Sequence, residues 1–208
     1  MPPDPTTSKV SNFSAAVQGR LYGGYNWQVS PKWLTGIEGD IGFGDSSMTR
    51  RGIPGTFGNA LNAGFAGTEA ELADSSGVKL GWDGTVRGKL GMLIAPSLLF
   101  YGTAGVAFQQ VSATASCDGS ANSVCAIART QTFSSVRTGW TAGGGIEGLI
   151  SGNWIGKVEV RYADFGKYNR TFFAGTGDDV VSSVHVQTYT ALAGVAYKFG
   201  PNTVVAKY

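Results

Sequence analysis

The sequence is poor in charge and has no long apolar run. Lys, Arg, Asp and Glu make up 14% of its 208 residues, against about a quarter in soluble proteins, so there are too few charges for an ordinary wet surface. The formal net charge is only +2, and no basic cluster with interleaved aromatics is present, so we expect no nucleic-acid partner. The lack of any apolar run of about eighteen residues excludes transmembrane helices but leaves transmembrane strands open.

Residues that carry catalysis are also scarce. The sequence has a single histidine, His185, which is near a few hydroxyls and carboxylates in sequence: Ser182, Ser183, Asp178 and Asp179. Adjacent strand residues face opposite ways, so these do not form a catalytic constellation. The run Gly143–Gly145 lies within a predicted strand, where it admits large neighbouring side chains rather than binding phosphate. We expect no enzymatic activity, no cofactor and no metal.

Only two cysteines are present, Cys117 and Cys125, both in the Ser- and Ala-rich segment SATASCDGSANSVC. A close pair in such a segment, with no histidine nearby to complete a metal site, predicts a local disulfide formed in an oxidising compartment. The alternative is two free thiols.

What the sequence does have is a strict alternation of apolar and polar residues, clearest at Gly81–Phe108. Its first strand places apolar side chains on one side, at Leu80, Trp82, Val86, Leu90, Met92 and Ile94. The other side carries Lys79, Asp83, Thr85, Arg87 and Lys89. After the turn Ala95–Ser97, a second strand again has one apolar side. Each strand exceeds about ten residues, which is long for a soluble sheet and sufficient to cross a bilayer at a tilt.

The rest of the chain repeats this unit. Strands are expected at 13–29, 33–44, 79–94, 98–108, 133–150, 154–166 and 184–199. Short turns alternate with long connections at 45–77, 112–132 and 167–183, the asymmetry of periplasmic turns and extracellular loops. This predicts an all-β, antiparallel, up-and-down transmembrane β-barrel of the eight-stranded type, with about seven full strands plus a short C-terminal segment. The alternative is a soluble barrel with its apolar face inward.

The predicted barrel occupies 13–199, preceded by a disordered or outer-loop segment at 1–12 and followed by a tail or short strand at 200–208. Barrels of this class have an even number of strands, so one upward strand is missing. The start, MPPDPTTSKV, does not resemble an export signal. We expect that a signal and a first strand precede it. The alternative is a natural chain with this start, in which Thr203–Tyr208 partly fills the gap.

If the apolar faces meet lipid, the charged faces line the lumen. The predicted lumen charges are Arg20, Glu38, Asp40, Lys79, Asp83, Arg87, Lys89, Arg137, Glu147, Lys157, Glu159 and Arg161. An eight-stranded barrel has room inside only for side chains, so these charges are expected to pair and plug the lumen. The alternative is a selectivity-lining pore. The aromatics expected at the lipid interfaces are Trp27, Trp33, Trp82, Phe100, Trp140, Trp154, Tyr189, Tyr197 and Phe199.

Several stretches resemble a known family. They are GRLYGGYNWQVSPKWLTGIEGDIGFG, VRGKLGMLIAPSLLFYGTAGVAF, GWTAGGGIEGLISGNWIGKVEVRYADFG and ALAGVAYKFG. They resemble the small outer-membrane β-barrel proteins of alphaproteobacteria, the OmpA-type, porin-family or surface-antigen class. The resemblance implies that Tyr197 and Phe199 match the closing-strand aromatics that the barrel-assembly machinery reads. It also implies that full-length members begin with a signal peptide and a first strand.

Together these observations predict an integral protein of the bacterial outer membrane with a structural, surface-exposed role and a plugged lumen. Its expected partners are outer-membrane lipid, lipopolysaccharide and the barrel-assembly machinery. One alternative is a narrow porin for small solutes. Another, resting on family analogy alone, is a surface protein that binds a ligand such as haem, or adheres, through its long loops.

Overall fold

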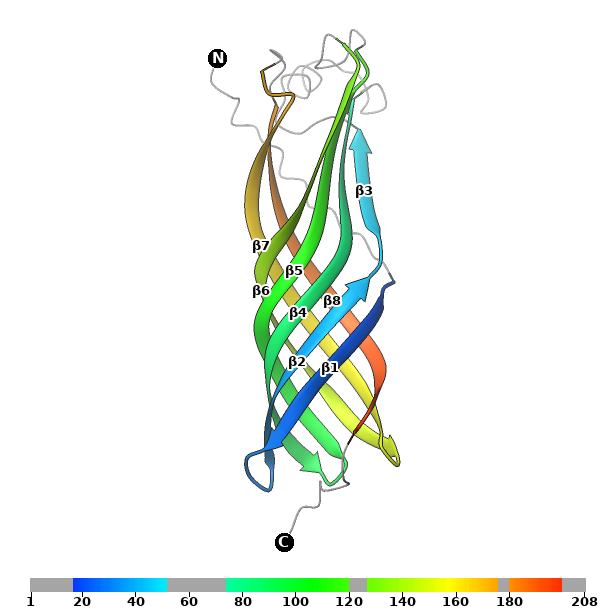
Figure 1. Ribbon diagram of the computed structural model, residues 1–208, viewed down its shortest axis with the longest axis vertical. Coiled ribbons are helices and arrows are strands. Elements are labelled where there is room, and N and C mark those ends of the chain that lie inside the picture. The colour runs from blue at the N-terminus through cyan, green and yellow to red at the C-terminus, as the bar shows by residue number, and fades with distance from the viewer. Residues whose placement is uncertain (1–16, 52–73, 120–126, 176–179, 200–208) are drawn as a thin grey trace, which may run out of the picture.

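The chain folds into one antiparallel sheet that curls into a long barrel (Figure 1). The structure is a computed structural model that describes residues 17–51, 74–119, 127–175 and 180–199. Its strands are β1 (Gly19–Gln28), β2 (Trp33–Phe43), β3 (Ser46–Arg51), β4 (Ser75–Ala95), β5 (Leu98–Cys117), β6 (Arg129–Ser151), β7 (Trp154–Phe172) and β8 (Val180–Tyr197). Among these residues there is no helix long and apolar enough to cross a membrane.

Seven strand positions run around the barrel, because β2 and β3 share one. β2 pairs with β4 between Asp83 and Met92, and β3 pairs with the same strand between Ser75 and Leu80. Every other neighbouring pair is also antiparallel. The edge strands β1 and β8 therefore run in the same direction, and within the described residues no backbone pairing joins them. The predicted up-and-down barrel with about seven strands is confirmed.

In the half of the barrel nearest the short turns, apolar side chains face outward and charged ones inward. Val158 and Val160 on β7 are 61% and 63% exposed, whereas Glu159 between them is 1% exposed. Aromatic side chains mark both ends of this apolar band. Trp154 lies beside the turn, and Tyr162 packs between Trp140 and Tyr189 higher up. From Trp154 to Tyr162 a tilted strand covers roughly 20 Å, close to the apolar band of about 25 Å in outer-membrane barrels.

The structure places most of the predicted interface aromatics on the outside of the barrel. Those whose side chains are exposed are Trp27, Trp33, Phe100, Trp140, Trp154, Tyr189, Tyr197 and Phe199. Trp82 is the exception, because it is half-buried and not exposed. It lies where the register of β4 shifts against β5. Contact of these rings with lipid stays a prediction.

The predicted long connections are shorter than expected, which corrects the sequence interpretation. β4, β5 and β6 contain 21, 20 and 23 residues, and they continue well beyond the ends of β1 and β2 as an extension of the barrel (Figure 1). β3 also lies within the segment expected to be a loop. These stretches were not predicted as strands because their alternating residues are small, as in Ser112–Ser116, where Ala alternates with Ser and Thr.

In this extension the polarity of the two faces is inverted. Buried apolar side chains fill the inside, in one cluster with Ala107, Val111, Ala163, Phe165 and Val186 and a second with Ala113, Ala115, Cys117, Phe172 and Phe173. Hydroxyl groups cover the outside of β5 and β6 in facing pairs, Ser112–Ser134, Thr114–Thr132 and Ser116–Thr130, with oxygens 2.7–2.9 Å apart. Apolar-in and polar-out is the pattern of a sheet surrounded by water.

Candidate functional site

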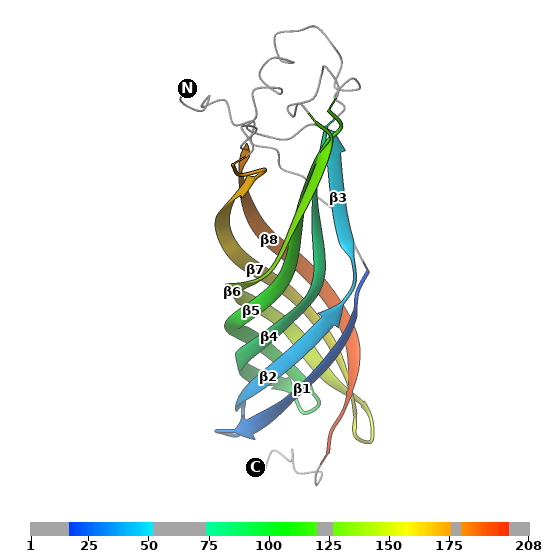
Figure 2. The same ribbon diagram turned by 45° about the horizontal axis from the view of Figure 1, so that its top comes forward.

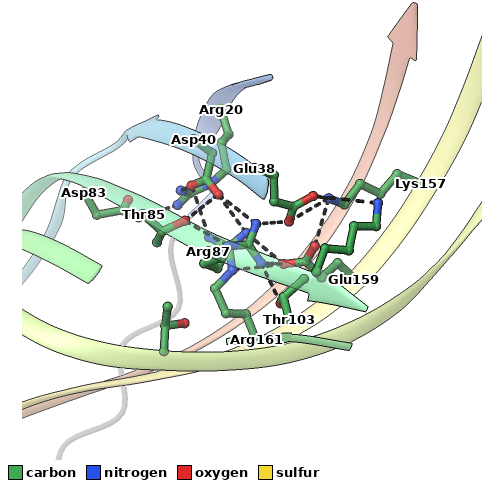
Figure 3. A network of polar contacts seen from close by, with 12 residues as sticks. Arg20, Glu38, Asp40, Asp83, Thr85, Arg87, Thr103, Lys157, Glu159 and Arg161 are labelled. Carbon is green, nitrogen blue, oxygen red and sulfur yellow. Dashed lines mark hydrogen bonds and ion pairs between the residues drawn. The ribbon is translucent and has the colours of Figure 1, made fainter. Parts of the chain in front are cut away.

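The lumen of the lower half holds a single network of ion pairs (Figure 3). It joins five cations to five carboxylates, and each member lies within 4 Å of at least one opposite charge. The cations are Arg20, Arg87, Lys89, Lys157 and Arg161, and the carboxylates are Glu38, Asp40, Asp83, Glu147 and Glu159. The five positive and five negative charges of the network therefore balance, and none of them comes from β8. These are ten of the twelve charges predicted to line the lumen.

Arg87 of β4 is the most connected cation. Its guanidinium lies 2.5 Å from Glu38, 2.9 Å from Asp40 and 2.5 Å from Glu159. The same group donates hydrogen bonds to the hydroxyls of Thr85 and Thr103. Its side chain is 1% exposed. A planar group with five donors suits this position, because it satisfies several carboxylates at fixed angles.

Glu159 of β7 is the matching anion and is fully buried. It contacts Arg87, Lys157 and Arg161, at 2.5, 3.0 and 2.8 Å. The Tyr101 hydroxyl donates to it at 2.9 Å, and the Lys89 ammonium lies 4.2 Å from the centre of the Tyr101 ring. Tyr101 was not singled out in the sequence, although the alternation along β5 places it on the lumen side.

A glycine makes room for Tyr101. A Cβ atom at Gly145 would lie 2.6 Å from the Tyr101 hydroxyl oxygen and 2.3 Å from the Val158 carbonyl oxygen. No other residue fits without moving the backbone or the ring. The role predicted for the Gly143–Gly145 run, to admit a large neighbouring side chain, is confirmed at this position.

Ion pairs also join opposite walls of the barrel. Lys157 on β7 contacts Glu38 on β2 at 3.0 Å, and Arg161 contacts Asp40 at the same distance. β2 and β7 are separated by β4, β5 and β6 along the sheet in one direction and by the unpaired β1 and β8 edges in the other. These contacts therefore hold the sheet in the shape of a barrel although its edge strands are not paired with each other.

Some buried polar atoms on the β1 side have no hydrogen-bond partner, namely the Arg20 Nε, the Tyr22 hydroxyl and one Asp83 oxygen.

Two predicted lumen charges lie outside this network, and the prediction for Lys79 is wrong. The register of β4 against β5 shifts between Leu80 and Asp83. The extra residue turns Leu80 inward, where it packs on the apolar cluster around Val111, and turns Lys79 outward. A β-bulge reverses the alternation in this way.

The second of these charges, Arg137, does face inward, but its guanidinium lies over the Tyr168 ring, 3.9 Å from the ring centre.

Lys79 is expected to contribute little to stability. It pairs with Asp45 at 3.0 Å, and the two side chains are 53% and 68% exposed. Replacing Lys79 by Ala should lower the free energy of unfolding by less than about 1 kcal/mol, because water screens an exposed pair. Urea titration of the refolded barrel in vesicles measures this change. A loss as large as that of a buried network member would contradict the outward position of Lys79.

The remaining candidate residues lie apart from the lumen. His185 contacts Asp164 at 3.0 Å on the outer face of β7 and β8, and Gln187 donates to the other Asp164 oxygen at 2.9 Å. Within the described residues the hydrogen bond of His185 goes to Asp164, so the structure brings no serine to it.

Cys117 ends β5 and is buried. Cys125 lies outside the described residues, and the predicted disulfide stays a prediction.

The sequence that forms this barrel matches a known family. Residues 4–199 match the family described as outer membrane protein beta-barrel domain. The chain belongs to this family. Its outer-membrane localisation follows, and the predicted resemblance to alphaproteobacterial outer-membrane barrels is confirmed.

Relatives of this outer-membrane barrel come from alphaproteobacteria. The 31 kDa outer-membrane immunogenic protein of Brucella melitensis is 32% identical over 182 residues, which cover 87% of this chain and 65% of that protein. The 22 kDa outer membrane protein of Rhizobium leguminosarum is 28% identical, over 71% of this chain and 52% of that protein. The chain thus spans less than two thirds of these relatives. It is also similar to the crystal structure of Ail, the attachment invasion locus protein of Yersinia pestis, with a TM-score of 0.41, 15% identity, and coverage of 86% and 79%.

Proposed function

We propose that this outer-membrane barrel is a sealed, structural protein of the envelope that presents its extension to the outside. The observation that carries the proposal is the buried network of five cations and five carboxylates across the lumen. Buried charges are tolerated where they are paired. The side chains of a paired cluster of this size occupy the space that water would fill in an open pore.

Apolar layers above and below the network support the same proposal. Towards the short turns, Leu34, Leu99 and Tyr101 are buried together, with Leu93 packed against them. Towards the extension, the cluster around Val111 and Phe165 fills the lumen. An ion that crossed the barrel would have to pass two layers formed mainly by apolar side chains and one layer whose charges are already paired. This arrangement favours the plugged barrel over the narrow porin.

The inverted extension supports exposure at the surface. Its hydroxyl-covered outer face is suited to water and to the sugars of the outer leaflet, and lies beyond the upper aromatics. The Brucella relative is named an immunogenic protein, and we extend surface exposure to this chain as part of the proposal. We also propose outer-membrane lipid and lipopolysaccharide as its surroundings, and the barrel-assembly machinery as the partner of Tyr197 and Phe199.

Conductance of the purified barrel in planar bilayers tests the seal. We expect no steady current from the unmodified chain. The double substitution Arg87→Ala and Glu159→Ala removes one cation and one carboxylate from the centre of the network but leaves the apolar layers above and below it, so it should add only rare, brief openings while the lumen stays neutral. Lys79→Ala is the matched control and should remain silent. Steady channels from the unmodified chain would overturn the sealed barrel in favour of the porin.

A further inference from the structure

Above the apolar band the barrel divides into two arms (Figure 2). Pairing between β6 and β7 ends at Trp140 and Asp164. Beyond this point β6 pairs with β5, and β7 pairs with β8. One arm therefore consists of β3 with the outer parts of β4, β5 and β6, and the other of the outer parts of β7 and β8. A Cβ at Gly139 would clash with the Asp164 carbonyl oxygen, so the two backbones still lie close together where the arms separate.

In the part of the chain that the structure describes, side chains and not backbone pairing connect the arms. We name this contact the inter-arm junction and define it by Phe133 and Arg137 of β6 and by Tyr168, Arg170 and Phe172 of β7. The Arg137 guanidinium lies 3.9 Å from the centre of the Tyr168 ring, and the Arg170 guanidinium lies 5.8 Å from that of Phe133. The rings of Phe133 and Phe172 are 5.2 Å apart.

The two arginines of the junction differ from the lumen cations in their surroundings. Within the described residues, no carboxylate lies at ion-pair distance from Arg137 or Arg170, whereas every cation of the lumen network meets at least one. The Arg137 Nε and the Tyr168 hydroxyl are buried and have no hydrogen-bond partner. A buried donor left unpaired costs free energy, so a site with two such donors and two cations favours an anion that accepts from both.

Both arginines of the junction influence the Tyr168 phenol. Burial raises the pKa of the Tyr168 phenol, while the positive charges of Arg137 and Arg170 lower it. The hydroxyl stays protonated at neutral pH and remains a donor. The rings of Phe133 and Phe172 add apolar surface beside the two guanidinium groups.

We propose that the inter-arm junction binds a small organic anion, a phosphate or sulfate group carried on a flat apolar body. The anionic group pairs with the guanidinium groups of Arg137 and Arg170 and reaches the buried Arg137 Nε and Tyr168 hydroxyl once the two arms move apart, and the body packs on the aromatic rings. Because these residues face the inside of the extension, the ligand enters from the external solution and not from the bilayer. This inference goes beyond the sealed barrel, since it concerns the arms and leaves the lumen network unchanged.

Calorimetric titration of the refolded full chain in detergent, free of lipopolysaccharide, tests the proposal with phenyl phosphate as the probe. Arg137→Gln should weaken binding about tenfold, the size expected for a charged hydrogen bond. Arg170→Gln should weaken it as well, and it provides a second reading if the first variant folds poorly. Lys79→Gln removes an equal charge on the outer face of β4 and should bind within about twofold of the unmodified chain.

Two further titrations separate the parts of the ligand. Inorganic phosphate should bind more weakly than phenyl phosphate, and phenol should bind more weakly still, because each lacks one of the two recognised features. No heat up to about 10 mM phenyl phosphate, or unchanged affinity in both arginine variants, would overturn the proposal. Equal affinity for inorganic and phenyl phosphate would overturn the role of the rings.

Discussion

Replacing Arg87 by Met is expected to lower the free energy of unfolding by about 3–5 kcal/mol, because it leaves buried carboxylates without their main partner. Glu38, Asp40 and Glu159 all contact this guanidinium within 2.9 Å. Methionine keeps much of the volume and flexibility of the side chain, so the loss reports charge more than packing. Urea titration in lipid vesicles, followed by tryptophan fluorescence and by circular dichroism, measures the change.

A double-mutant cycle separates the pair from the rest of the network. The second variant is Glu159→Gln, and the third combines both substitutions. The combined loss should be smaller than the sum of the single losses, because the double variant removes one charge of each sign and restores neutrality. A loss below about 1 kcal/mol for Arg87→Met would mean that water reaches the lumen and screens the carboxylates. That result would contradict the dry, sealed core.

The lower half of the barrel could be predicted because a bilayer imposes a simple rule on strands. Side chains alternate with period two, and lipid accepts only one of the two faces. The alternation along β7, with Val158 and Val160 against Lys157 and Glu159, therefore identifies both faces without a structure. The same alternation places Tyr101 in the lumen, although a tyrosine carries no formal charge to draw attention to it.

The upper half could not be predicted in the same way, for two physical reasons. A bulge adds one residue to β4 between Leu80 and Asp83, and Gly81 within it is only one of many glycines in the strands, so Lys79 was assigned to the wrong face. The strands of the extension also alternate between small residues, whose low hydropathy is typical of loops. Contacts between the arms, such as Arg137 with Tyr168, join residues distant in sequence and depend on where the β6–β7 pairing ends.

The inversion of the faces predicts where the bilayer ends. Below the row of Trp140, Tyr162 and Tyr189, the outward side chains are aliphatic and the inward ones are charged. Above it, hydroxyls line the outside of β5 and β6, as at Thr132, and apolar clusters fill much of the inside, as at Phe133. Water outside the strand requires the second arrangement, and lipid outside it requires the first. One continuous strand, β6, contains both.

The same substitution on the two sides of this boundary should therefore have very different effects. Val158→Arg places a charge on the outward face midway between Trp154 and Tyr162, where 61% of the valine is exposed. It should destabilise the barrel in vesicles by about 2–4 kcal/mol, the cost of an arginine near the middle of the apolar band. Thr132→Arg is the matched control, since Thr132 is also exposed on the outward face of its strand. It should change stability by less than about 0.5 kcal/mol.

Both variants add one positive charge to an outward strand position, so a difference between them reports the surroundings and not the charge. Folding in vesicles, monitored by tryptophan fluorescence across a urea series, gives both values under one condition. Equal and small effects would mean that Val158 faces water, which would contradict the position of the apolar band. Equal and large effects would place Thr132 in lipid and shift the bilayer onto the extension. Only a loss confined to Val158→Arg agrees with a barrel that leaves the membrane at the row of Trp140, Tyr162 and Tyr189.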